Sequence, residues 1–241
     1  MRLAPRTLPH FLAALILLSG VAYVERGRLL ELLRGTGVAP GRTVSQVQAA
    51  CAERGEGSYE AVGRAAGLAW PPHRLQILAF KEERLLEVWG ANDGGGWVFL
   101  GEHPILGASG GPGPKRREGD LQVPEGIYAL PELNPNSRFH LSIRVGYPNQ
   151  DDIRNARVPR RQMGGDIFIH GGSASIGCIA IGNEAIEKLF CLAAKVASGR
   201  RGVLIAPYDF RRRREEAPMG DEPWVGDLYA RLARELAAFR R

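Results

Sequence analysis

Residues 167–181 are the stretch most informative about the fold of this chain: Ile-Phe-Ile-His-Gly-Gly-Ser-Ala-Ser-Ile-Gly-Cys-Ile-Ala-Ile. An apolar run ends at His170, a stretch of small residues follows, and Cys178 opens a second apolar run. The pattern predicts two strands that hold an imidazole and a thiol at the ends of a tight connection. Glycines beside both side chains leave backbone N–H groups that can face a developing negative charge.

This His/Cys pair has three interpretations. A thiol attacks a carbonyl carbon only as the thiolate, and a neighbouring imidazole can take its proton, so Cys178 and His170 fit an acyl-transfer site. Metal binding is the second interpretation, but one His and one Cys are two ligands short of a structural zinc set. Packing of a buried thiol is the third. The residues alone leave acyl transfer and packing open, and they predict no metal site and no cofactor.

Composition sets broad limits on the fold and its partners. The chain has 241 residues, of which 44% are hydrophobic, enough for one sizeable core. Its three cysteines are too unevenly spaced to predict a disulfide framework, so we expect at least one free thiol and interpret Cys51 and Cys191 as buried packing residues. The net charge is +6, and four of the positive charges lie in residues 211–214, interpreted as a solvated segment. Aromatic and basic residues are not interleaved, so nucleic acid is not an expected partner.

The first residues have the layout of an export signal. Arg2 and Arg6 precede an apolar run over residues 11–24 that is shorter than a typical membrane-spanning helix. We therefore expect residues 1–24 to be a signal peptide or an N-terminal membrane anchor, and the rest of the chain to be periplasmic. A buried helix of a cytosolic fold is the alternative. Contact with the membrane is expected only through this segment.

The remaining chain divides into three parts by its pattern. Residues 25–73 predict a helical prelude, with a short helix around residues 29–33 and a second over 43–54. Residues 74–210 predict an α+β domain that is predominantly β, with a hairpin over 75–89 and a surface loop over 107–120. Residues 211–241 predict a basic linker and an amphipathic helix.

Two details of the middle part bear on the site. Residues 139–145 alternate as a half-buried strand, which predicts that Phe139 faces the core while His140 and Arg144 share the opposite, polar face. Asn183 is expected to cap a helix whose first turn contains Glu184.

The order His170-Gly171 followed by Ser175-Ile176-Gly177-Cys178 resembles the signature of the L,D-transpeptidase catalytic domain, or YkuD-type, family. Residues 80–89, 109–115, 118–128 and 140–149 resemble the exported Gram-negative branch of that family. The resemblance covers about residues 75–210. It implies a mostly β catalytic domain, here carrying short helical extensions at both ends.

The resemblance also implies an activity. Cys178 would attack the carbonyl between the L-centre of diaminopimelate and D-Ala in a peptidoglycan stem peptide, and a thioester would form as D-Ala leaves. An amine from another stem peptide or from a wall-anchored protein, or else water, would then resolve the thioester. His170 would form the thiolate, with the carbonyl of Gly171 orienting the imidazole. The N–H groups of Gly177 and Cys178 would bind the oxyanion, and Ser175 would shape the pocket.

The sequence departs from the family pattern at three features. Ile176 stands where typical members have histidine, Ala180 stands where they have arginine, and the segment from His170 to Cys178 is about half the usual length. Another cation must then bind a substrate carboxylate, if the substrate is the same. The candidate substrate-binding residues are Lys115, Arg116, Arg144 and His140. A short, open segment also admits water, so an L,D-hydrolase that cleaves peptide or protein links from diaminopimelate is the alternative to a transpeptidase. A non-catalytic wall-binding protein is the second alternative.

Overall fold

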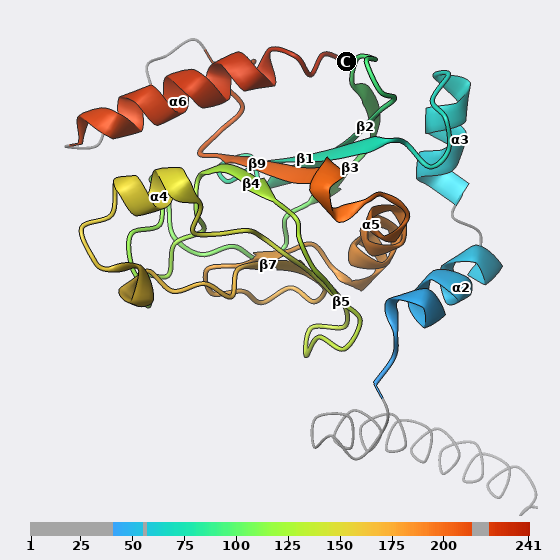
Figure 1. Ribbon diagram of the computed structural model, residues 1–241, viewed down its shortest axis with the longest axis horizontal. Helices are drawn as coiled ribbons and strands as arrows, with labels where there is room; N and C mark the ends of the chain where they lie inside the picture. Colours follow the sequence, from blue (N-terminus) through green and yellow to red (C-terminus); the bar gives the residue numbers. More distant parts are fainter. Residues whose placement is uncertain (1–40, 55–56, 214–221) are drawn as a thin grey trace, which may run out of the picture. The chain divides into compact units, whose positions relative to one another are not determined.

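The computed structural model of this chain describes residues 41–54, 57–213 and 222–241 (Figure 1). Residues 1–42 and 43–241 are separate units, and every helix and strand below belongs to the second. The expected export segment 1–24 and the start of the expected helical prelude lie outside the described residues. Within the described ranges, no helix is both long enough and apolar enough to cross a membrane.

A five-stranded sheet carries the largest part of the core, in the order β3-β2-β1-β9-β4. The predicted hairpin is confirmed, because β1 and β2 pair antiparallel with Phe80 opposite Leu85. β1 pairs in parallel with β9, and β4 pairs antiparallel with β9 as the edge strand on that side. The bounds are β1 Arg74–Phe80, β2 Leu85–Ala91, β3 Val98–Pro104, β4 Gly126–Ala129 and β9 Arg201–Ala206.

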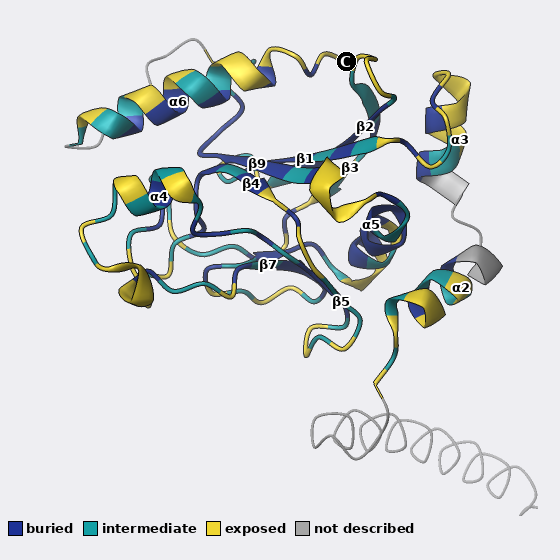
Figure 2. Cartoon of the chain, in the orientation of Figure 1, coloured by how far each residue is buried: buried dark blue, intermediate teal, exposed yellow. Residues whose placement is uncertain are grey.

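Both faces of this sheet are covered, which explains why its central strands are apolar at nearly every position. Ile77 and Ala79 of β1 face the larger hydrophobic cluster, whereas Leu78 and Phe80 face a second cluster on the other side. That second cluster is completed by the C-terminal helix α6, Pro223–Leu236, which buries Leu228, Leu232 and Leu236 (Figures 1 and 2). The amphipathic helix expected near the C-terminus is therefore present.

A second, four-stranded sheet holds the His/Cys stretch, in the order β5-β6-β7-β8. Its strands are short: β5 Leu133–Asn134, β6 Ser142–Arg144, β7 Phe168–His170 and β8 Ile179–Ala180. β7 and β8 are parallel, although only residues 171–178 join them. Parallel neighbours normally need a connection of about a dozen residues or more. The shorter link suffices because these two strands have only three and two residues.

Helices pack against both sheets. The bounds are α2 Val44–Arg54, α3 Gly57–Ala65, α4 Gln150–Arg154, α5 Asn183–Lys195 and α6 as above, with short 3-10 turns at Arg160–Gln162 and Ser198–Arg200. α5 places Ile186, Leu189 and Phe190 in the cluster that also holds residues of both sheets (Figure 2). The helix expected after Cys178 is therefore present, with its central turns buried.

Two cysteines that were interpreted only as packing residues are bonded to each other. Cys51 of α2 and Cys191 of α5 form a disulfide with a Cα–Cα distance of 6.3 Å. Cys178 is the free thiol, as expected of at least one cysteine. The spacing gave no sign of the disulfide because its partners are 140 residues apart and meet only through tertiary packing.

The start of α5 differs from the expectation in one detail. Gly182, and not Asn183, is the N-cap residue, and it makes no side-chain capping bond. Glu184 does lie in the first turn, as expected. The side chain of Asn183 instead accepts a hydrogen bond from the N–H of Gly172 at 2.8 Å, so it serves the loop between β7 and β8.

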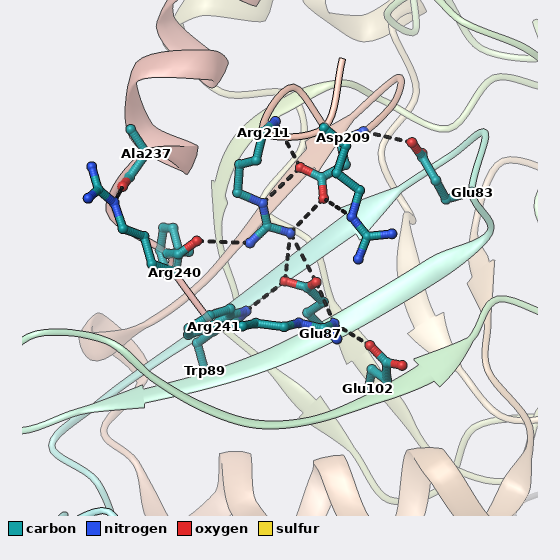
Figure 3. A network of polar contacts seen from close by, with 11 residues as sticks. Glu83, Glu87, Trp89, Glu102, Asp209, Arg211, Ala237, Arg240 and Arg241 are labelled. Carbon is teal, nitrogen blue, oxygen red and sulfur yellow. Dashed lines mark hydrogen bonds and ion pairs between the residues drawn. The ribbon is translucent and has the colours of Figure 1, made fainter. Parts of the chain in front are cut away.

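The arginines after β9 are not simply solvated. Arg211 lies within 3.0 Å of the carboxylate of Glu87, which is fully buried on β2, and within 2.8 Å of that of Asp209 (Figure 3). Arg241, the last residue, also reaches Glu87 at 2.7 Å, and the guanidinium of Arg211 donates to the carbonyl of Phe239 at 3.1 Å. The interpretation of this run as a solvated segment is therefore wrong at Arg211. A buried carboxylate requires charged or hydrogen-bonding partners, and the C-terminal segment supplies them.

Candidate active site

The two strands that hold the His/Cys stretch set its geometry. Ile169 pairs with Ile179, and His170 pairs with Ala180. One step earlier, Cys178 lies beside Phe168, whose N–H donates to the sulfur at 3.4 Å. Side chains two residues apart on a strand point to the same face. His170 and Cys178 are therefore diagonal neighbours on one face, next to the loop that joins β7 to β8.

His170 is buried and oriented by its own neighbour. Its Nδ1 lies 2.6 Å from the carbonyl oxygen of Gly171, and a carbonyl only accepts, so Nδ1 carries the proton. This leaves Nε2 as the basic nitrogen. Burial lowers the pKa of His170, while the bond to Gly171 acts in the opposite direction. The imidazole is therefore held neutral in the resting site and can accept a proton.

Cys178 is held as a neutral thiol by similar physics. Burial raises the pKa of Cys178, the N–H of Phe168 lowers it, the Asp166 carboxylate raises it and the Lys115 ammonium lowers it. The net direction is upward. Because the pKa of His170 is also shifted toward the neutral form, the resting site contains a thiol and an imidazole rather than an ion pair.

Position 171 requires glycine because neighbouring atoms lie too close for a side chain. A Cβ atom there would lie 2.6 Å from the carbonyl oxygen of Phe139 and 2.6 Å from Oδ1 of Asn183, both shorter than real contacts. The absence of a side chain therefore lets residue 139 and the start of α5 close against the turn that follows His170. The orientation of the imidazole depends on this arrangement.

Phe139 forms part of the site, contrary to the expectation that it faces the core. Its ring stacks on the imidazole of His170, with centroids 4.4 Å apart and 28° between the planes, and it is 49% exposed. The predicted strand begins only at Ser142, because His140 has a left-handed φ of 78° and interrupts the alternation. Leu141, Ile143 and Val145 are buried, as the pattern predicted.

Two serine hydroxyls face the N–H groups expected to bind the oxyanion. The N–H of Cys178 donates to Oγ of Ser175 at 3.1 Å. The N–H of Gly177 donates to Oγ of Ser109 at 2.7 Å, and Ser109 comes from the glycine-rich loop far earlier in the chain. Ser109, Phe139 and Asn183 are the residues that sequence reasoning missed at this site. Ser109 did lie within a stretch that resembled the family, but no pattern related it to Gly177.

The four candidate substrate-binding residues all have acidic partners. Lys115 is buried, and its Nζ lies 2.6 Å from Asp120, although its charge still acts on the pKa of Cys178. The other three pairs hold residues against neighbouring elements rather than against the thiol. They are Arg116 with Glu222 at 3.0 Å, Arg144 with Glu132 at 3.5 Å and His140 with Glu187 at 2.5 Å. Across the described part of the chain, no group of three His, Cys, Asp or Glu side chains is arranged to hold a metal ion.

The model of the L,D-transpeptidase catalytic domain family, YkuD, matches residues 75–203, which is more than half of the 241 residues. This chain belongs to that family. Its α+β fold, with mixed sheets and few helices, agrees with that membership.

YafK of Escherichia coli strain K12, itself only provisionally assigned as an L,D-transpeptidase, is 36% identical over 140 residues. That match covers 57% of this chain and 54% of YafK, so the chain spans about half the length of the curated relatives it matches. Among solved structures, the helical cell shape determining protein Pgp2 of Campylobacter jejuni is 27% identical, with a TM-score of 0.45, over 55% of this chain and 47% of Pgp2. Bd1075 of Bdellovibrio bacteriovorus is 28% identical, with a TM-score of 0.42, over 58% of this chain and 50% of Bd1075.

Proposed function

We propose that this member of the L,D-transpeptidase family is an exported cysteine acyl-transfer enzyme that acts on peptidoglycan stem peptides. The observation that carries the proposal is that the register of two adjacent strands places the free thiol of Cys178 and the imidazole of His170, whose Nε2 is basic, on one face. A neutral imidazole beside a protonated thiol is suited to take the proton as the sulfur attacks. Family membership supports the substrate class.

The reaction proceeds in two halves. The sulfur of Cys178 attacks the carbonyl at the L-centre of diaminopimelate, and Nε2 of His170 takes the thiol proton. The N–H groups of Gly177 and Cys178 stabilise the negative oxygen of the tetrahedral intermediate. When this intermediate collapses, the bond to D-Ala breaks, and His170 returns the proton to the leaving amine. An incoming amine, from a second stem peptide or a wall-anchored protein, or water then attacks the thioester and releases the thiol.

Export of the catalytic unit is supported by the disulfide. Disulfides persist in oxidising compartments and are rare in the cytosol, where thiols are kept reduced. The Cys51–Cys191 bond therefore agrees with the export layout of residues 1–24 and with a periplasmic location. No further contact with a membrane and no nucleic-acid partner are proposed.

Hydrolysis is the second candidate outcome of the same chemistry. The segment 171–178 is short, and Ser173, Ala174 and Ile176 on it are exposed. A thioester beneath such a segment is reached by water as well as by an amine. A hydrolase could cleave either D-Ala or a linked protein from diaminopimelate. It would use the same first half-reaction, and only the acceptor, water, would differ.

Purified protein incubated with isolated muropeptides tests the proposal, with products identified by mass spectrometry. Cross-linked or exchanged products indicate transpeptidation, and shortened stem peptides indicate hydrolysis. Both are expected to disappear in Cys178→Ala. Absence of any product with the wild-type protein, under conditions in which a relative with demonstrated activity turns over, would contradict the enzymatic proposal. Retention of peptidoglycan on the protein without any product would favour a non-catalytic wall-binding role.

A further inference from the structure

The contact between Ser109 and Gly177 has no role in the reaction as proposed so far. The N–H of Gly177 is directed at Oγ of Ser109 at 2.7 Å, across a separation of 68 residues. The hydroxyl of Ser109 in turn donates to the carbonyl of Leu121 at 2.6 Å, so its oxygen is free to accept. One polar side chain thus occupies the position in front of an N–H that the proposed reaction requires.

The loop that carries Ser109 is fixed on both sides of this residue. Before it, Gly107 and Ala180 of β8 exchange backbone hydrogen bonds at 3.2 and 2.8 Å. After it, the almost buried Nζ of Lys81 donates to the carbonyls of Gly113 and Val123, each at 3.0 Å. Lys81 also pairs with the buried Glu125 at 3.0 Å. The backbone of the loop on either side of Ser109 is therefore held in place by the surrounding fold.

Gly177 needs such a partner. It has a φ of 82°, a region that glycine enters at little cost, and glycine also leaves it at little cost. If the peptide between residues 176 and 177 turned over, it would direct a carbonyl oxygen toward Ser109 in place of the N–H. Oxyanion stabilisation is effective only when the donors point at the site before the charge develops. A fixed acceptor at Ser109 favours the peptide orientation that presents the N–H.

We propose that Ser109 is a positioning residue whose hydroxyl holds the N–H of Gly177 in its oxyanion-binding orientation until the substrate carbonyl oxygen displaces it. This inference rests on the proposed function in one respect only, namely attack of Cys178 on a carbonyl. It does not depend on the peptidoglycan substrate. The hydroxyl of Ser175 stands in the same relation to the N–H of Cys178, but it lies only three residues away and moves with the same turn.

Two small reagents separate this role from a merely structural one. p-Nitrophenyl acetate acylates the thiol through a tetrahedral oxyanion, whereas iodoacetamide alkylates it by displacement and forms no oxyanion. Rate constants for Cys178 are measured with both reagents in the full-length protein, its disulfide intact. The variants are Ser109→Ala and the matched pair Ser109→Thr and Ser109→Val, which have the same shape and differ in the hydroxyl. Ser198→Ala, at an exposed serine on the turn after α5, controls for loss of a serine hydroxyl elsewhere.

We expect acylation to fall about tenfold in Ser109→Ala and Ser109→Val, because an oxyanion donor is worth about 10²- to 10³-fold and only part of the molecules lose it. Alkylation should stay within about twofold of wild type, and Ser109→Thr should restore most of the acylation. Unchanged or faster acylation without the hydroxyl would overturn the inference, as would an equal fall with both reagents. A wild-type protein that is alkylated but never acylated would overturn this inference and the proposed function together. Wild-type acylation that depends on Ser109, without any muropeptide product, would leave the inference standing and count against the proposed substrate.

Discussion

Two polar regions of this molecule are built on opposite principles. The network around Glu87, Asp209, Arg211 and Arg241 gathers charges of both signs and pairs them within about 3 Å (Figure 3). The site around His170 and Cys178 instead keeps both reactive groups neutral, since the pKa of the imidazole is lowered and that of the thiol is raised. The first region holds the C-terminal segment against β2, and the second is the site at which we propose the transfer of one proton.

The two regions also differ in the exposed hydrophobic side chains around them. Among the described residues, the large exposed hydrophobic side chains are Val62, Leu106, Leu121, Phe139 and Ile176. All but Val62 lie on segments that contact the His/Cys stretch or Ser109. Ion pairs therefore suit the segment that the network holds in place, and neutral groups suit the proton transfer that we propose at the His/Cys site.

The largest expected effect is on the site. Cys178→Ala should abolish product formation from muropeptides, a loss of at least about 10³-fold, because no other group supplies the nucleophile. Its free energy of unfolding, from denaturant titration, should change by less than about 1 kcal/mol, since the thiol is small and half-buried and forms no ion pair among the described residues. Full activity in this variant would refute the assignment of the nucleophile.

Breaking the charged network should lower stability and leave the reactivity of Cys178 unchanged. Arg211→Met leaves the buried carboxylates of Glu87 and Asp209 short of a cation, which should lower the free energy of unfolding by about 3 kcal/mol. Alkylation of Cys178 by iodoacetamide should not change. The matched control is Arg213→Met, whose exposed pair with Glu82 should be worth less than about 1 kcal/mol. Equal effects of the two variants would show that the network does not stabilise the fold.

Removal of the disulfide should lower stability by an amount similar to that for Arg211→Met. The double variant Cys51→Ser with Cys191→Ser should lose about 2 to 4 kcal/mol of unfolding free energy, because the bond restricts a long loop of the unfolded chain. Dithiothreitol should destabilise the wild type by a similar amount and leave the double variant unchanged. If the reductant affected both proteins alike, the effect would not come from this bond.

The pH dependence of Cys178 alkylation tests whether the resting site is neutral. The pKa of this thiol is raised, so the thiolate fraction is small at pH 7 and rises with pH. Below that pKa, the rate with iodoacetamide should increase about tenfold per pH unit, and it should level off at a higher pH than for a cysteine peptide. A plateau already reached between pH 6 and 7 would instead indicate a standing thiolate–imidazolium pair.

The smallest expected effect concerns the aromatic ring at the site. Phe139→Ala removes the stack on His170, which should lower acylation about two- to tenfold through looser orientation of the imidazole. Phe139→Tyr keeps the ring and should stay close to wild type. Stability should change little because the ring is half-exposed. A large loss of stability with unchanged acylation would assign Phe139 to the core, as the sequence pattern alone suggested.

Local patterns predicted the elements that depend on neighbouring residues. The hairpin of β1 and β2, the strands on either side of the His/Cys segment and the C-terminal helix all follow from apolar spacing over a few residues. The family resemblance likewise rests on a continuous motif, and family membership confirms it. The expected domain boundaries, the roles of the site residues and the export of the chain stay predictions.

Features that depend on distant residues or on a single backbone angle could not be predicted in this way. The Cys51–Cys191 bond, the contact of Ser109 with Gly177 and the pairing of Arg211 with Glu87 each join positions at least 68 residues apart. Phe139 was misplaced for a different reason. A left-handed angle at His140, a residue with a Cβ, is favoured by the fold around it and not by any repeat in the sequence.

The direct link between the parallel strands β7 and β8 makes the length of one loop an adjustable trait. Residues 171–178 span the gap without a crossover helix, and the small, exposed Ser173 and Ala174 lie at the surface. Doubling the length of a flexible loop costs only about 0.6 kcal/mol in closure entropy. Insertions at this point could therefore build a cover over the thiol during evolution, or in the laboratory, with little loss of stability. A change in the acyl acceptor could thus evolve through insertions in residues 171–178 without a large loss of stability.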